Sequence, residues 1–193
     1  MIKRSFLFIT LFIWFISVGF GQQKFEKEYR IKSEDVPAAA HNFIQKITNK
    51  KRFKWVAEES QDGKTIEAKF YKNGTKYSVE FDIKGQLIDI EVLTSISNLP
   101  ASEKALVEKA LGKEFTKFRI RKIQKQFKNI TLDQIESFFH SKENKNFDTY
   151  NFEIVVKGKS KERFELYELL ISKSGDLLKK LKFGPPNSLN LQF

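Results

Sequence analysis

The stretch NGTKYSVEFDIKGQLIDIEV, residues 73–92, decides the expected fold. Asn73-Gly74 tolerates the positive φ values of a tight two-residue turn, and Lys84-Gly85 supplies a second turn. Around these turns, apolar and polar residues alternate with a period of two, which is typical of half-buried β-strands. The stretch therefore predicts the last two strands of an antiparallel sheet. Its apolar positions are Tyr77, Val79, Phe81, Ile83, Ile88, Ile90 and Val92.

Two more strands and a helix are expected before this hairpin. Residues 53–71 alternate in the same way around the turn Asp62-Gly63. Upstream, Ser33, Asp35 and Pro37 are typical of a helix start, and apolar residues then recur at helical spacing to about Asn49. Residues 22–32 are polar and expected to be frayed. Residues 33–95 thus predict a helix on a four-stranded meander, whose polar face would present Lys69, Tyr71, Glu80 and Asp89 to solvent.

The plan recurs over residues 97–184. Leu99-Pro100 echoes Val36-Pro37, Gly112 fits the end of a second helix, and Tyr167 precedes Gly175 with the spacing of Tyr77 to Gly85. An insert near residues 129–148 contains a capping box, Thr131 with Gln134, which predicts an extra short helix. The expected fold class is α+β, with two tandem units, each a helix packed on a four-stranded antiparallel meander sheet. One strand is apolar on both faces and needs a second cover, either the inserted helix or a bound protein; its residues include Phe164, Leu166 and Leu170.

Residues 1–21 have the layout of a secretory signal peptide. Lys3 and Arg4 precede an apolar run of about sixteen residues, which is short for a membrane span of roughly twenty. The alternative is an uncleaved N-terminal anchor. The chain has no cysteine, so packing must supply its stability. Residues 185–193 form a tail, either an added edge strand or a disordered end.

The motif Y-x-V-x-F-D-x-x-G-x-x-x-x-x-E, from Tyr77 to Glu91, follows a V-P pair near a helix start. In an exported chain, this resembles the PepSY-like domains, and two units in tandem resemble the fold of β-lactamase inhibitory protein. The second unit departs from the pattern, since Ser172 stands where Asp82 stands. The resemblance implies a non-catalytic exported module that binds or inhibits another protein, and it implies no catalytic residues.

The residues themselves predict no catalytic, metal or cofactor site. His41 and His140 are the two histidines, and their positions do not predict a shared zinc site. Glu58 and Glu59 are neighbours on a strand, so their side chains should point to opposite faces. Asp62, Asp82 and Asp176 lie beside turn glycines, where aspartate is common for turn reasons.

Basic residues exceed acidic ones by 35 to 24, and several are clustered. The clusters indicate either solvated faces, which we favour, or a surface for acidic glycans, lipid headgroups or an acidic partner. They comprise Lys50, Lys51, Arg52 and Lys54; Lys117, Arg119, Arg121, Lys122, Lys125 and Lys128; and Lys179, Lys180 and Lys182.

We therefore expect a periplasmic or secreted module that is not an enzyme and that acts by binding, or by inhibitor-like contact with, another envelope or secreted protein. The alternative is a basic envelope protein that binds carbohydrate or lipid headgroups. Nucleic acid is not an expected partner, and membrane contact would require an uncleaved leader or the basic patches.

Overall fold

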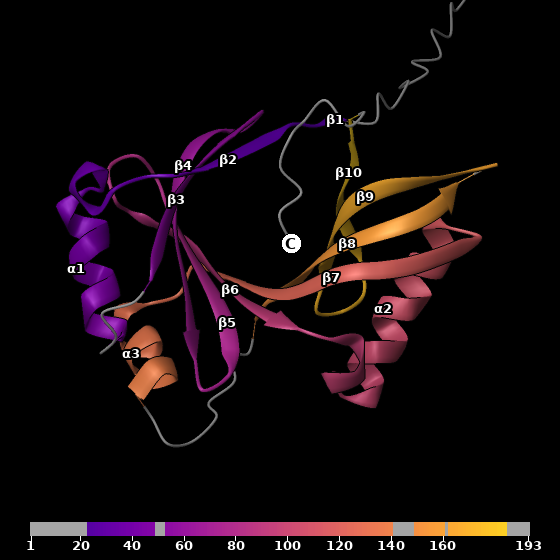
Figure 1. The fold of residues 1–193 in the computed structure, drawn as a ribbon. Helices are drawn as coiled ribbons and strands as arrows, with labels where there is room; N and C mark the ends of the chain where they lie inside the picture. Colours follow the sequence, from indigo (N-terminus) through magenta and orange to yellow (C-terminus); the bar gives the residue numbers. More distant parts are fainter. Residues whose placement is uncertain (1–22, 49–52, 141–148, 161, 185–193) are drawn as a thin grey trace, which may run out of the picture.

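The structure is a computed structural model that describes residues 23–48, 53–140, 149–160 and 162–184 (Figure 1). The leader, residues 1–21, and the tail, residues 185–193, lie outside the described residues, as do residues 141–148 of the insert. Within the described part, no helix is long and apolar enough to cross a membrane.

The described strands form one sheet instead of two. All ten belong to a single sheet in the order β1-β10-β9-β8-β7-β6-β5-β4-β3-β2, and every neighbouring pair is antiparallel except β1 with β10. The strands are β1 (Gln23–Lys24), β2 (Glu26–Arg30), β3 (Lys54–Ser60), β4 (Gly63–Lys72), β5 (Thr75–Phe81), β6 (Leu87–Thr94), β7 (Lys117–Lys128), β8 (Asn151–Ser160), β9 (Arg163–Ser172) and β10 (Leu177–Phe183).

The expectation of two tandem units with separate four-stranded sheets is wrong. Strand β6 pairs with β7 from Asp89 opposite Lys128 to Thr94 opposite Ile123, which joins the two sets of strands. Separate sheets would leave the backbone N–H and C=O groups of both strands unpaired at an edge, and pairing satisfies them. Period-two patterns reveal strands but not which strands become neighbours across a long connection.

The expectation that residues 22–32 are frayed is also wrong for the strands that the structure describes between residues 23 and 30. Strand β2 pairs with β3, and β1 pairs with β10 through Gln23 opposite Lys182 and Lys24 opposite Phe183. Only Phe25 separates β1 from β2, so this one segment reaches from one end of the sheet order to the other (Figure 1). The sheet is therefore strongly curved and nearly barrel-shaped.

Three helices cover the outer face of this curved sheet: α1 (Ala38–Ile47), α2 (Ala101–Glu114) and α3 (Leu132–His140). Short 3-10 turns, Ser33–Asp35 and Ile96–Asn98, precede α1 and α2. The first helix begins later than predicted because Pro37 occupies its N-cap position. The second continues through Gly112 to Glu114, so the predicted stop at that glycine is wrong.

The capping box predicted in the insert is confirmed. The backbone N–H of Thr131 donates to Gln134 Oε1 at 2.9 Å, and the backbone N–H of Gln134 donates to Thr131 Oγ1 at 3.3 Å. Helix α3 does not cover β9, however. It packs Phe139 against Phe70 and Tyr77 of β4 and β5, with ring centroids 6.1 and 5.4 Å apart.

Two turns place a glycine in close contact with a helix, one with the start of α1 and the other with α2. Gly85, with φ +82°, lies against Pro37 and Ala40 at the start of α1, and Gly175, with φ +91°, lies against Leu106 of α2. In each turn the glycine N–H donates to a carbonyl three residues earlier, in Asp82 and Ser172 respectively. A side chain at either position would be strained by the positive φ and by these neighbours.

Candidate functional site

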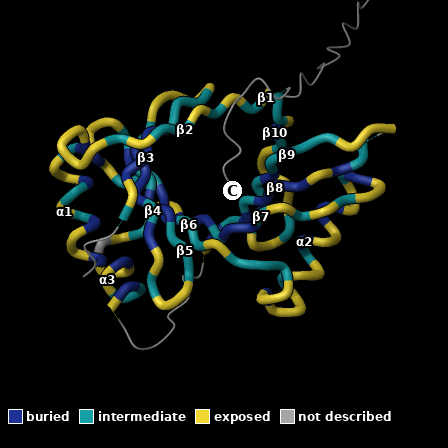
Figure 2. Tube along the Cα trace, in the orientation of Figure 1, coloured by how far each residue is buried: buried dark blue, intermediate teal, exposed yellow. Residues whose placement is uncertain are grey.

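The face of the sheet without helices is polar and hollow. Each strand alternates, so its apolar side chains pack under the helices while its polar side chains point to the inside of the curve. Buried residues run through the central strands, and exposed residues gather at the turns and on the helices (Figure 2). Of the residues predicted to face solvent, Lys69, Glu80 and Asp89 therefore line an enclosed surface, and Asp89 is only 1% exposed. Tyr71 is 61% exposed, as predicted.

One end of this hollow, the acid-lined cavity, has a volume of about 330 Å³. Ten carboxylate residues and five lysines line it, although the whole chain carries a net charge of +11. The acids are Glu26, Glu28, Glu58, Asp62, Glu67, Glu80, Asp89, Glu91, Glu153 and Glu168. Its apolar lining is Ile88, Leu170 and Leu181.

The other end, the amphipathic cavity, has a volume of about 460 Å³ and the opposite balance of charge. Lys76 and Arg121 line it beside apolar residues that include Leu93, Ile96 and Phe183. Burial first, and then the charges of Lys69 and Lys122, lower the pKa of Lys76. In the described part of the chain, neither Lys76 nor Arg121 has an acidic partner within 4 Å.

A layer of ion pairs lies where the two cavities meet, since its lysines line both. Lys69 Nζ lies 2.9 Å from Glu28 and 2.7 Å from Glu67. Lys24 Nζ lies 2.5 Å from Glu26 and also pairs with Glu168. Lys122 Nζ lies 3.9 Å from Glu153. Opposite charges compensate one another here, and the layer ties the β1–β2 segment to β4 and β9.

Carboxylates outnumber lysines away from this layer. Glu67 lies directly opposite Glu80, and Glu80 directly opposite Asp89, so three acids form a row across β4, β5 and β6. Like charges directly opposite each other on a sheet are destabilising. Burial first, and then the charge of Glu80, raise the pKa of Asp89 well above its usual value.

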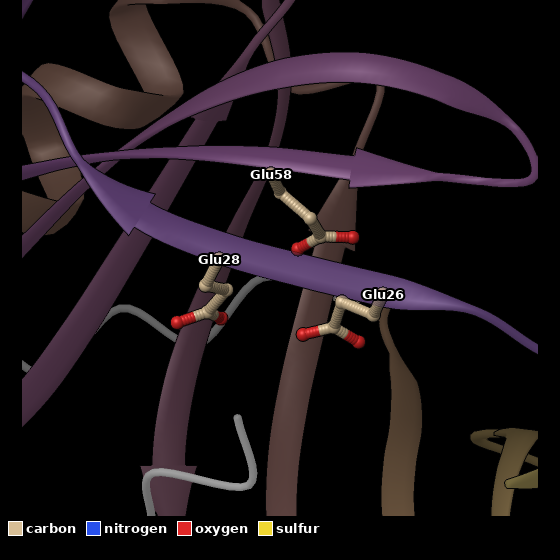
Figure 3. A group of neighbouring side chains, drawn as sticks. All are labelled: Glu26, Glu28 and Glu58. Carbon is tan, nitrogen blue, oxygen red and sulfur yellow. The ribbon is translucent and has the colours of Figure 1, made fainter. Parts of the chain in front are cut away.

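A second group of acids, Glu26, Glu28 and Glu58, lies on β2 and β3. Their three side chains extend toward the same side of the strands (Figure 3), and one oxygen from each lies within 4.8 Å of the others. Burial first, and then Glu26, raise the pKa of Glu58 to about 8. Among the described residues, Glu58 has no ion pair or hydrogen bond to a base.

Two buried oxygens on the strands β6 and β7 have no hydrogen-bond partner. Gln126 Nε2 donates to Asp89 Oδ2 at 3.0 Å, and Lys128 Nζ lies 3.7 Å from the same oxygen. Asp89 Oδ1 and Gln126 Oε1 remain unpaired within the described residues. Buried polar atoms without partners are rare, so both require an explanation.

The residues considered from sequence are placed mainly as expected. His41 stacks near Trp55 at 6.2 Å between ring centroids, and His140 Nε2 lies 2.9 Å from Lys46 O. Neither histidine lines either of the two cavities described above. Glu58 and Glu59 do diverge, since Glu59 accepts a hydrogen bond from the Tyr29 hydroxyl at 2.8 Å.

Two of the three turn aspartates, Asp82 and Asp176, make hydrogen bonds within their turns, as predicted. Asp82 Oδ1 accepts the backbone N–H groups of Lys84 and Gln86 at 2.8 Å, and Asp176 accepts from Ser174 at 2.7 Å. Asp62 has a further role, because it pairs with Lys179 at 2.9 Å between the β3–β4 turn and β10.

The basic cluster on β7 does not form one surface. A bulge between Ile120 and Lys122 shifts the alternation of this strand. Lys122 turns into the hollow, whereas Lys125 pairs with Glu103 of α2 at 3.0 Å on the helix side. The acid-lined cavity was missed from sequence because its acids come from seven strands and the β3–β4 turn. The available signal was that acids recur at alternate, same-face positions in β2 and β6.

No family model and no curated protein matches the chain. Solved structures do match it. A DUF2874 family protein from Bacteroides ovatus is 17% identical, with a TM-score of 0.52 over 76% of this chain and 87% of its own. A structure described under "putative periplasmic proteins" from Bacteroides eggerthii is 17% identical, with a TM-score of 0.51 over 76% and 88%.

A protein described as BLIP-like, from Bacteroides fragilis, is 17% identical over 76% of this chain and 86% of its own, with a TM-score of 0.48. Identities this low establish similarity of fold alone. The Bacteroides ovatus and Bacteroides eggerthii structures show that this chain shares its sheet-and-helix fold with those bacterial proteins.

Proposed function

We propose that this chain is an exported, non-catalytic binding module of the PepSY-like kind, which contacts another envelope or secreted protein. The observation that supports it best is the hollow, helix-free face of the sheet. Three helices bury the opposite face, whereas this face is lined by charged side chains at both of its cavities. The similarity to a protein described as periplasmic supports the proposed location.

The partner would contact the rim of this face. Leu93, 39% exposed, lies at the amphipathic cavity, and the exposed Asp62 lies at the acid-lined cavity. Both positions can therefore carry a reporter without disturbing the core beneath the helices. Lys109 on the outer side of α2 is exposed and lines neither cavity, which makes it the matched control.

The test is site-specific photo-crosslinking in cells that produce the full chain. A photoreactive residue at Leu93 or Asp62 should capture a discrete envelope or secreted protein, and one at Lys109 should not. Capture from Lys109 alone, or from no position, would contradict the proposal.

A second candidate function is binding of an anionic headgroup in the amphipathic cavity. The specific observation is that Lys76 and Arg121 have no acidic partner in the described chain and lie beside apolar side chains. The doubly substituted variant Lys76→Gln, Arg121→Gln should lose binding to phosphatidylglycerol vesicles, and Lys109→Gln should retain it. Equal binding by both variants would exclude this site.

A further inference from the structure

The acid-lined cavity presents carboxylates on two different sides. The group Glu26, Glu28 and Glu58 belongs to β2 and β3. The unpaired oxygens of Asp89 and Gln126 belong to β6 and β7, which are four strands away in the sheet order. Because the sheet curves round until β1 meets β10, strands separated in this way face each other across the hollow (Figure 1).

Each side contains at least one acidic group without a matching donor, although Glu26 and Glu28 also pair with Lys24 and Lys69. Asp89 is 1% exposed and Gln126 is 7% exposed, so neither unpaired oxygen is compensated by bulk water. On the other side, Glu58 has no basic partner among the described residues. The groups missing from both sides are therefore hydrogen-bond donors that carry positive charge.

Apolar side chains line the same cavity as these polar groups. They are Ile88, Leu170 and Leu181, and Leu181 is 2% exposed. A single metal ion would need its oxygen ligands to converge at about 2.3–2.6 Å around one point. One ion cannot satisfy groups on two opposed sides and makes no use of apolar lining.

We propose that the acid-lined cavity binds a small aliphatic diamine or polyamine, with one ammonium group at Glu26, Glu28 and Glu58 and another at Asp89 and Gln126. The methylene chain would lie along Ile88, Leu170 and Leu181. An ammonium group supplies three donors, so it can satisfy several acceptors at once. A volume of about 330 Å³ is within the usual size of small-molecule sites. This ligand is independent of the protein partner proposed above.

The site has an entrance between the β3–β4 turn and β10. Asp62 and Lys179 are both partly or largely exposed, line the cavity and form an ion pair at 2.9 Å. An incoming cation can replace Lys179 as the partner of Asp62 before it reaches the inner carboxylates. The net negative lining would concentrate cations at this entrance.

The test is isothermal titration of the purified full chain with diaminopropane, putrescine, cadaverine and spermidine at about pH 8.5, where amines remain charged. Butylamine, which has only one charged end, is the control for binding of a single ammonium group. Calcium chloride tests whether the cavity binds a metal ion instead. We expect one binding site, with the best diamine binding at least about tenfold more tightly than butylamine.

The variants Asp89→Asn and Glu58→Gln should each weaken diamine binding at least about tenfold, because each removes one carboxylate that would pair with an ammonium group. Glu108→Gln, on the exposed face of α2, should leave the affinity unchanged. Thermal unfolding of each variant shows whether it is folded. Glutamine and asparagine match their parents in size, so unfolding is not expected.

Three results would overturn the proposal: no saturable binding of any diamine, equal affinity for diamine and butylamine, or stoichiometric calcium binding that amines do not displace. Equal affinity would instead indicate a site for a single lysine side chain. Photo-crosslinking at Leu93 and Asp62 detects a protein partner, whereas titration of the purified chain detects an amine, so failure of one proposal can be told apart from failure of the other.

Discussion

Glu80 of β5 lies directly opposite Asp89 of β6, and both side chains belong to the enclosed polar face of the sheet. Glu67 lies opposite Glu80 on its other side. Burial first, and then the charge of Glu67, raise the pKa of Glu80. Three acids in one row indicate that like charges repel one another across β4, β5 and β6.

We predict that Glu80→Gln raises the free energy of unfolding by about 0.5–1 kcal/mol, because it removes the middle charge of the row. Urea denaturation at pH 8 measures the change. Glu108→Gln is the control, since this exposed glutamate faces Lys104 at 3.9 Å on the surface of α2. A less stable Glu80→Gln protein would show that Glu80 compensates a cation instead of repelling its neighbours.

The stability of the chain should also fall as pH rises from about 4.5 to about 8. Burial is the first cause that raises the pKa of both Glu58 and Glu91 to about 8, from an ordinary value of 4.5. In this window the folded state keeps protons that the unfolded state releases. Their stabilising contribution is therefore complete below pH 4.5 and is lost through pH 8, at no more than about 1.4 kcal/mol per pH unit for each group.

The variant Glu91→Gln tests this dependence. Its free energy of unfolding, compared with that of the parent in urea at each pH, should increase progressively between pH 4.5 and 8 as the parent loses its proton. Glu26 and Glu103, whose pKa values are lowered, act with the opposite sign and below this window. A constant difference between variant and parent would contradict the raised pKa of Glu91.

The elements of the fold were largely predictable because their signals are local. Asn73 has φ 51° and Gly74 has φ 80°, as the predicted turn requires, and Thr131 with Gln134 forms its capping box. Each of these features depends on residues within four positions of one another. Period and turn chemistry determine such short-range structure directly.

The joining of the sheet and the position of the site were not predictable in this way. Nothing in β6 alone indicates that Asp89 faces Lys128 of β7, and the polar Lys24 gives no sign that it pairs with Glu168. A polar sheet face looks the same in sequence whether it meets solvent or encloses a cavity. Curvature of the whole sheet decides between the two, and it depends on pairings between distant residues.

Gly158 of β8 should be intolerant of even a methyl group. A Cβ built on this glycine would lie 2.3 Å from the ring of Phe115, which follows α2 and lies 5.0 Å from Tyr167 between ring centroids. We predict that Gly158→Ala lowers the free energy of unfolding by about 1–3 kcal/mol through overpacking.

Gly112→Ala is the matched control. Gly112 lies within α2, and a Cβ there would meet nothing within 4 Å. Alanine is favoured over glycine in a helix by about 0.5–1 kcal/mol, so this variant should be more stable than the parent. Urea denaturation of both variants should give changes of opposite sign. Similar effects of the two substitutions would contradict the close contact with Phe115.

Lys24 should hold the sheet closed. Its Nζ pairs with Glu168 of β9 and with Glu26, and its side chain is only 12% exposed. The variant Lys24→Met keeps the aliphatic stem but leaves Glu168 without this base. Breaking a fully buried ion pair costs 3–5 kcal/mol, so this partly buried one should cost about 2 kcal/mol in the free energy of unfolding.

The loss of stability in Lys24→Met should be confined to the region where β1 pairs with β10. Because β1 meets β10 only at Lys182 and Phe183, hydrogen exchange in Lys24→Met should accelerate in the last residues of β10. Strand β8, paired on both sides by β7 and β9, should keep its protection. Lys27→Met, on the exposed side of the same segment, is the control and should change neither quantity. Unaltered exchange in β10 would mean that backbone pairing alone closes the sheet.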